Sequence, residues 1–206
     1  MKLLNCKIDV SKKVFEPRQE TEFWVGSTIK ELLFREGRIN CLDIFSGSGC
    51  IGIAILKNIR DAIVDFADIS DDALEQIEIN LKINKISPQR YEIIKSDIFD
   101  NLKRRKYDFI FANPPYVASD RASEVQKEVL ERDPHLALFA GRDGLDIIKG
   151  FLSEVKGHLK PGGKVFMEFD PKQKERIKEI LNEYELSVSF YKDQFHKYRW
   201  LTASKD

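Results

Sequence analysis

Short apolar runs alternate with stretches of helical spacing along most of this 206-residue chain. The apolar runs cover residues 39–45, 62–67, 91–94, 107–112 and 165–169, followed by 186–191 and 200–203. Segments with apolar residues at helical spacing lie at 20–33, 51–56, 70–85, around 123–130, 144–159 and 173–184. Strands that alternate with helices predict an α/β fold with a largely parallel sheet.

A chain of this length predicts one domain, with room for a small appendage. Leu4, Cys6, Ile8 and Val10 alternate with polar residues, a pattern typical of a strand or hairpin. Pro17 then interrupts the pattern. We therefore expect a hairpin-like extension over residues 1–15 and one main domain over residues 16–206.

The charges balance, because 34 lysine and arginine residues face 34 aspartate and glutamate residues. This balance argues against a strongly basic nucleic-acid binder that is held mainly by phosphate attraction. The chain has no apolar leader after Met1 and no apolar run of about 18 residues. We expect a cytoplasmic protein with no membrane partner.

Neither the cysteines nor the histidines form a metal-site pattern. Cys6, Cys41 and Cys50 include no CxxC pair, and the last two lie beside or within apolar runs, so reduced core thiols are expected. The three histidines are far apart and lie near no cluster of acids or thiols. We therefore expect no bound metal.

Ligands of parallel α/β sheets bind outside the carboxyl ends of the strands, so polar residues at these ends are site candidates. The run at 39–45 leads into Ser46-Gly47-Ser48-Gly49 and then into a helical segment. Glycines allow a tight turn and close approach of the backbone to a ligand. The turn is no P-loop, because no Gly-Lys-Ser/Thr follows. A plain strand-to-helix turn is the alternative.

Two acids follow the next apolar runs. Asp68 lies 19 residues after Gly49, a distance that suits an acceptor for ribose hydroxyls. Asp97 precedes Ile98 and Phe99, so it could bind an adenine amino group while the apolar side chains pack on the ring. A helix-capping acid and a turn acid are the alternatives.

The fourth strand end carries the sharpest signal, Asn113-Pro114-Pro115-Tyr116. The two prolines fix φ and remove backbone donors, and the Asn113 side-chain oxygen is a further acceptor. Tyr116 offers an aromatic face. Together they could hold a planar NH2 group, which methylation of an amide or exocyclic amino nitrogen requires. Two acceptors would pull on the N–H bonds and help to localise the nitrogen lone pair.

Other enzyme classes fit less well. A serine hydrolase lacks its GxSxG elbow here. An NAD oxidoreductase could use the strand, glycine turn and acid, but it gives the NPPY tetrad no role.

The order DxxxGxG, strand-end acid, SD and NPPY resembles that of class I S-adenosylmethionine-dependent methyltransferases that act on amino or amide nitrogen. The resemblance extends to the release factor glutamine methyltransferase family. Residues 16–22 (EPRQETE) resemble its (I)PRPETE segment, and residues 133–138 (DPHLAL) with 140–146 (AGRDGLD) resemble EPxxAL and AGxDGL. Residues 159–163 (LKPGG) match a further motif, so the resemblance runs from about Leu4 to the C-terminus.

The resemblance implies a Rossmann-like fold with a mostly parallel seven-stranded sheet, flanked by helices and preceded by a short hairpin. It implies S-adenosylmethionine as cofactor and a peptide chain release factor as substrate. The implied cofactor-binding residues are Asp43, Phe45, Ser46, Gly47, Ser48, Gly49, Asp68, Ile69, Asp97, Ile98 and Asn113. The implied catalytic residues are Asn113, Pro114, Pro115 and Tyr116. The implied substrate-binding residues are Pro17, Arg18, Glu20, Thr21, Asn113, Pro114 and Tyr116.

The chain departs from the family pattern in several places. Phe45 replaces the first glycine of the cofactor loop, and Glu168-Phe169-Asp170 stands where the family usually has a glycine after the acid. Residues 195–199 (FHKYR) lack a usual glycine-arginine step. Bacterial members carry a helical N-terminal domain that helps to engage the release factor, whereas only a short stretch precedes Pro17 here.

Two alternatives remain beside glutamine methylation. The first is N6-adenine or N2-guanine methylation of RNA or DNA, because the NPPY geometry suits a flipped-out base as well. The basic residues at 103–106 with Lys192, Lys197 and Arg199 could then contact phosphates. The second is a degenerate binding module that has lost its activity.

Overall fold

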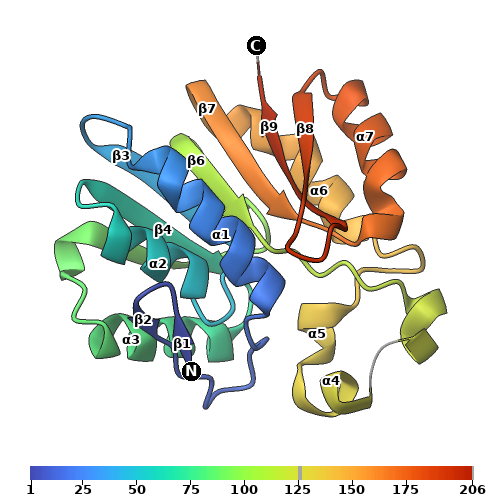
Figure 1. The fold of residues 1–206 in the computed structure, drawn as a ribbon, viewed down its shortest axis with the longest axis horizontal. Coiled ribbons are helices and arrows are strands. Elements are labelled where there is room, and N and C mark those ends of the chain that lie inside the picture. The colour runs from blue at the N-terminus through green and yellow to red at the C-terminus, as the bar shows by residue number, and fades with distance from the viewer. Residues whose placement is uncertain (125–126, 206) are drawn as a thin grey trace.

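The computed structural model describes residues 1–124 and 127–205, which fold around a seven-stranded sheet in the order β5-β4-β3-β6-β7-β9-β8 (Figure 1). All neighbours are parallel except β9, which runs antiparallel to β7 and β8. The strands are β3 (Ile39–Ile44), β4 (Ala62–Asp68), β5 (Tyr91–Lys95), β6 (Tyr107–Ala112), β7 (Leu159–Glu168), β8 (Ser187–Lys192) and β9 (Tyr198–Ser204). This sheet confirms the predicted Rossmann-like α/β fold.

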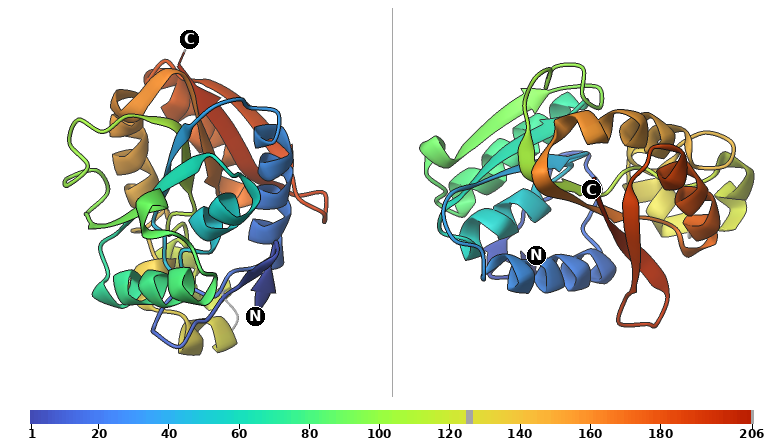
Figure 2. Two further views of the ribbon diagram at one scale, coloured as in Figure 1. Left: turned by 90° about the vertical axis from the view of Figure 1, so that its left-hand side faces the viewer. Right: turned by 90° about the horizontal axis from the view of Figure 1, so that it is seen from above.

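Helices cover both faces of the sheet, which Figure 2 shows from above. Buried side chains of α1 (Gln19–Leu32), α2 (Cys50–Asn58) and α3 (Asp71–Ile83) share one core with β3 and β4. Those of α6 (Asp146–Val155) and α7 (Lys174–Glu183) fill the core on the opposite face. Burial on both faces explains why the central strands are apolar along most of their length.

Short helices fill the connections. They are η1 (Pro88–Arg90), η2 (Ser119–Glu124), α4 (Lys127–Arg132), α5 (His135–Leu138), η3 (Lys156–His158) and η4 (Pro171–Gln173). The α4–α5 segment lies off the sheet, beyond the carboxyl ends of the parallel strands (Figure 1). No helix among the described residues is long and apolar enough to span a bilayer.

The expected N-terminal hairpin is present as β1 (Lys2–Leu3) and β2 (Cys6–Lys7). The chain turns at Leu4 and Asn5, which both have positive φ. The alternating apolar residues at 4–10 therefore do not form one continuous strand. Leu3 and Cys6 are buried in the core that α1 and α2 share.

Side-chain amides of α3 and of its C-cap residue Asn84 hold the end of the hairpin and the chain that follows it. Asn84 accepts from Lys7 N (2.9 Å) and donates to Lys7 O (2.7 Å). Asn80 accepts from Asp9 N (2.7 Å) and donates to Asp9 O and Ser48 O, both at 2.9 Å. Gln76 accepts from Lys12 N (2.8 Å). Spaced four residues apart on one helix face, these amides (which we call the amide ladder) take the place of a neighbouring strand.

Two local expectations were wrong or only partly met. The predicted helix over 144–159 ends at Val155, and β7 starts at Leu159, so residues 160–163 lie inside a strand. They bulge out of the ladder, because Tyr107 pairs with Leu159 while Phe109 pairs with Lys164. The helix expected around 123–130 is present as η2 and α4, with residues 125 and 126 outside the described part.

The amide ladder predicts a stability effect for Asn80→Ala. Asn80 is fully buried and bonds both Asp9 and the glycine turn, so its removal leaves backbone groups of both segments unpaired. We expect the free energy of unfolding to fall by about 2 kcal/mol in urea denaturation. Glu78→Ala, an exposed change on the same helix, should alter it by less than about 0.5 kcal/mol. Equal effects of the two variants would contradict this role.

Candidate functional site

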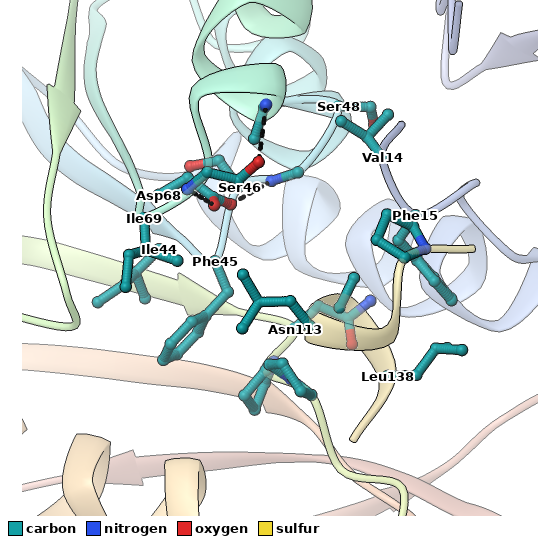
Figure 3. Close-up of a pocket in the computed structure, with 18 of the residues that line it drawn as sticks. Val14, Phe15, Ile44, Phe45, Ser46, Ser48, Asp68, Ile69, Asn113 and Leu138 are labelled. Atoms are coloured by element: carbon teal, nitrogen blue, oxygen red, sulfur yellow. Dashed lines mark hydrogen bonds between the residues drawn. The ribbon is translucent and has the colours of Figure 1, made fainter. Parts of the chain in front are cut away.

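One cavity of about 420 Å³ lies at the carboxyl ends of β3, β4 and β6 (Figure 3). β3 pairs with β4 on one side and β6 on the other, which makes this the switch point of the sheet. The registers Ile44↔Ala67 and Ile44↔Ala112 place the three strand ends at one level. The loops that follow them therefore meet.

The loop after β3 forms the glycine turn. Gly47 and Gly49 have φ of 52° and 72°, the left-handed region that favours glycine. A Cβ on Gly47 would meet no atom within 4 Å, so the backbone faces open space there. Ser46 Oγ donates to Asp43 O (2.6 Å) and so closes the turn.

Phe45 occupies the left-handed region as well, with φ of 58°. A bulky residue rarely adopts this conformation, so the turn carries local backbone strain. The Phe45 ring packs edge-on against Phe151 of α6, at 5.8 Å between centroids, and also lines the cavity. The side chain therefore occupies the α6 side of the turn.

Two carboxylates support the turn. Asp43 lies beneath it, where its Oδ2 accepts from Gly52 N (2.8 Å) and its Oδ1 has no partner among the described residues. Burial raises the pKa of Asp43 well above its usual value. Asp68 Oδ2 accepts from Gly47 N (2.8 Å), and Asp68 Oδ1 accepts from Ser70 N (3.0 Å). Burial raises the pKa of Asp68 too.

The loop after β5 reaches the rim of the cavity. Asp97 is exposed there, whereas Ile98 is half-buried with φ of 43°. Ser96 is buried and its Oγ donates to Ile98 O (2.9 Å), which holds this turn. Ile69, on the loop after β4, is also exposed toward the cavity. The rim therefore combines one carboxylate with apolar side chains.

Asn113 lies directly after β6, and no group in the described part of the chain hydrogen-bonds its side-chain amide. Tyr116, three residues on, is anchored at both ends. Gln173 Nε2 donates to Tyr116 O (3.0 Å), and the Tyr116 hydroxyl donates to Glu168 Oε1 (3.2 Å). The tetrad thus presents a free amide on a fixed loop.

The opposite wall comes from the segment before α1 and from α5. Val14, Phe15 and Leu138 face Asn113 across the cavity (Figure 3). An ion pair between Arg18 and the buried Asp133 joins the two segments.

A second ion pair reinforces this junction. Arg132 Nη1 lies 2.5 Å from Glu16 Oε2, and Glu16 N donates to Asp133 Oδ1 (3.5 Å). The Arg18 guanidinium also stacks over the Phe15 ring, with its carbon 4.8 Å from the centroid. These charged groups therefore hold the wall in place.

The structure brings most of the sequence-predicted residues around this cavity. The lining includes Pro17, Arg18, Thr21, Phe45, Ser46, Gly47, Ser48, Asp68, Ile69, Asp97, Ile98, Asn113, Pro114, Pro115 and Tyr116. Three predicted residues do not line it: Asp43, Gly49 and Glu20. Asp43 and Gly49 act on the turn from behind, because Asp43 binds Gly52 N and Gly49 N donates to Ser46 O (2.7 Å).

Sequence reasoning found Pro17, Arg18 and Thr21 but missed the rest of the opposite wall. Val14, Phe15, Pro134, Leu136 and Leu138 line the cavity without having been singled out. Residues 133–138 form a motif in the sequence, but the apolar residues of so short a helix carry no signal of what they face. The buried carboxylate of Glu168, behind Tyr116, was also missed.

The chemistry of the cavity suits a ligand with an apolar or planar part and several donors. A carboxylate can accept about four hydrogen bonds, and each Asp68 oxygen receives one from the protein. Asp68 and the free Asn113 amide leave acceptors for a ligand, whereas Asp43 lies outside the lining. The remaining lining is mostly apolar.

Residues 28–142 match the family model of the methyltransferase small domain. The chain is 38% identical over 198 residues to a release factor glutamine methyltransferase of Streptococcus pneumoniae, covering 95% of this chain and 69% of that protein. It is 37% identical over 171 residues to a ribosomal protein uL3 glutamine methyltransferase of Francisella tularensis, covering 79% of this chain and 51% of that protein.

The fold is similar to the crystal structure of a ribosomal protein L11 methylase from Lactobacillus delbrueckii. The TM-score is 0.71 at 20% identity, covering 97% of this chain and 84% of that one. This likeness shows the shared fold. The sequence relatives and the family model carry the assignment, and the chain belongs to the release factor glutamine methyltransferase family.

Proposed function

We propose that the protein transfers a methyl group from S-adenosylmethionine to the side-chain amide nitrogen of a glutamine in a peptide chain release factor. One observation carries the proposal: the free Asn113 amide and the glycine turn with Asp68 line the same cavity. A planar amide held by Asn113 would therefore lie beside a ligand on the turn.

The residues present fit the cofactor. Asp68 has a spare acceptor position on each oxygen for the ribose hydroxyls, and the open space at Gly47 lets the turn approach the methionine part. Asp97 with Ile98 and Ile69 would flank the adenine from the rim. S-adenosylmethionine, when bound, supplies an electrophilic methyl group.

The tetrad would hold the acceptor. The Asn113 side-chain oxygen and the Pro114 carbonyl would accept the two N–H bonds of the glutamine amide, while the Tyr116 ring packs on its plane. Pro17, Arg18 and Thr21 would border the glutamine from the opposite wall. Because the prolines fix the loop, most of the catalytic effect would come from positioning the nitrogen.

No general base is needed for this reaction, because the proton can leave during or after the attack. The Tyr116 hydroxyl is unsuited to the role, since burial and the nearby Glu168 charge raise its pKa well above that of an ordinary tyrosine. Asn113 and the Pro114 carbonyl act as acceptors alone. They would orient the N–H bonds without taking the proton.

The substrate class follows from the relatives. The Streptococcus pneumoniae relative is named for release factors and the Francisella tularensis relative for a ribosomal protein.

We assign the reaction to residues 16–206, with residues 1–15 as an extension that leads into the cavity wall, and place it in the cytoplasm with translation. Nothing in the cavity specifically favours a nucleic acid, and Arg105 of the basic run is tied to Asp65 and Glu92.

The acceptor assignment predicts the outcome of a direct comparison. With radiolabelled cofactor, purified release factor should take up the label, and the acceptor residue should be a glutamine by mass spectrometry. Ribosomal protein uL3, ribosomal RNA and DNA serve as parallel acceptors. Label in RNA or DNA alone would overturn the proposal, and label in uL3 alone would change the substrate while keeping the chemistry.

Asn113→Ala should lower kcat for methyl transfer by about 100-fold or more, because it removes an oriented acceptor from the reacting amide. Cofactor binding by calorimetry should survive. Asn182→Ala is the matched control, since Asn182 is exposed on α7 and lies outside the cavity. Unchanged turnover in the Asn113 variant would refute the amide grip.

Asp68→Asn should weaken cofactor binding about tenfold or more, because it removes a charged acceptor and disturbs the bond from Gly47 N. Burial raises the pKa of Asp68, so wild-type affinity should decline as falling pH protonates this carboxylate, whereas the variant should show a flatter profile. Asp71 is an exposed acid at the start of α3, so Asp71→Asn should bind the cofactor as the wild type does. Equal affinities of all three proteins in calorimetry would exclude this ribose contact.

A further inference from the structure

A buried carboxylate lies behind the Asn113–Tyr116 loop and outside the cavity lining. Glu168, the last residue of β7, is 1% exposed. Its Oε2 accepts from Thr21 Oγ1 and from Trp24 Nε1, both at 2.8 Å. Its Oε1 accepts from the Tyr116 hydroxyl at 3.2 Å. One side chain therefore joins helix α1 to the aromatic residue of the tetrad.

The two oxygens of Glu168 bind different parts of the protein: Oε2 binds α1, and Oε1 binds Tyr116. The Trp24 indole N–H can only donate, so Oε2 has to remain an acceptor toward α1. Within the described part of the chain, Oε1 accepts from the Tyr116 hydroxyl alone. The bond that reaches the site is thus separable from the bonds that hold the helix.

The rest of Tyr116 is fixed as well. Gln173 Nε2 holds its carbonyl and also donates to Gly144 O (3.0 Å). A Cβ on Gly144 would lie 2.3 Å from Tyr116 O, so the two segments pack without a gap. With the backbone held by Gln173, the hydroxyl bond to Glu168 sets the remaining freedom of the ring.

A positive charge near the cluster compensates for burial of the carboxylate. Arg199 follows the β8–β9 turn, where its Nε donates to Asp193 Oδ2 (3.2 Å), and its backbone carbonyl accepts from Phe169 N (2.9 Å). Burial raises the pKa of Glu168, while the bonds from Trp24 and Thr21 and the charge of Arg199 act in the opposite direction. Neutral donors and a nearby cation are what a buried carboxylate requires.

We propose that Glu168 is a positioning residue for methyl transfer, which holds the Tyr116 ring at the angle that the acceptor amide needs. The proposal rests on the proposed function, because it assumes that Tyr116 packs on the acceptor. Thr21 takes part in the same arrangement, because it lines the cavity while its hydroxyl donates to Glu168. Helix α1 and the tetrad are therefore aligned through one side chain.

Glu168→Gln tests the bond to Tyr116 selectively. The glutamine oxygen can still accept from Trp24 and Thr21, which turns its NH2 group toward Tyr116. Two donors then face each other unless the Tyr116 hydroxyl reverses its role. Tyr116→Phe removes the same bond and keeps the ring, so the two changes and their combination form a double-mutant cycle.

The chain offers a matched control pair. Asp65 Oδ2 accepts from the Tyr107 hydroxyl (2.8 Å), and both residues are buried away from the cavity. Asp65→Asn and Tyr107→Phe disturb the same chemistry without touching the site. They should lower the melting temperature and leave kcat at a permissive temperature unchanged.

The expected result is a loss in kcat of about tenfold for each of E168Q and Y116F, with little further loss in the double variant. Cofactor affinity by calorimetry should stay within about twofold, since neither group contacts the cofactor site. A normal kcat in E168Q, or fully multiplicative losses in the double variant, would overturn the proposal.

A second readout needs no acceptor. With 13C-labelled tyrosine ring carbons, the Tyr116 signal, identified by its absence in Y116F, should not titrate where exposed tyrosines do, near about pH 10. In E168Q it should titrate at lower pH than in the wild type, because the neighbouring negative charge is gone. A Tyr116 that titrates alike in both proteins would refute the contact. Wild-type protein that methylates no acceptor would instead refute the proposed function, so the two failures are distinguishable.

Discussion

The parallel register of β3 with β4 and β6 is the constraint on which the site depends. Ile44 pairs with Ala67 and with Ala112, so three strands stop at the same level. The glycine turn, Asp68 at the end of β4 and Asn113 directly after β6 therefore lie around one cavity, although they come from distant parts of the sequence. Hydrogen bonds to the turn then follow from proximity, as when Asp68 accepts from Gly47 N. A shift of one residue in either ladder would separate these groups and point alternate side chains to the wrong face.

The second half of the cavity depends on polar contacts that no sheet provides. The amide ladder of α3 fixes residues 7–12, and the ion pair of Arg18 with Asp133 fixes the segment just before α1. Val14 and Phe15 lie between these two attachments and face Asn113 across the cavity. The wall thus holds the apolar side chains of Val14 and Phe15 toward the cavity, beside Arg18, which also lines it. This arrangement gives a mostly apolar lining although the wall is an irregular segment.

The sequence predicted the strand ends well because each is marked by a polar residue after an apolar run. Asp68, Asn113 and the glycine turn were found in this way, and the structure brings them together. The start of β7 was misjudged, because Pro161 and two glycines are normally turn residues and here form a bulge inside a strand. Pro134–Leu138 and Glu168 were missed for a different reason. Their positions depend on the Arg18–Asp133 pair and on the packing of α1 over β7, and both are long-range contacts without a local sequence signature.

Phe45 shows how the fold accepts a bulky residue at a left-handed position that favours glycine. The backbone keeps the left-handed conformation that the turn needs, at a cost in strain of order 1–3 kcal/mol. Packing of the ring against Phe151 of α6 offsets part of that strain. The ring points away from Ser46 and Asp68 (Figure 3). Gly47 and Gly49 are left-handed as well, and Gly47 N donates to Asp68. The Phe45 ring therefore shapes the side of the cavity next to α6, whereas the glycines shape the carboxylate side, where the proposed ribose contact lies.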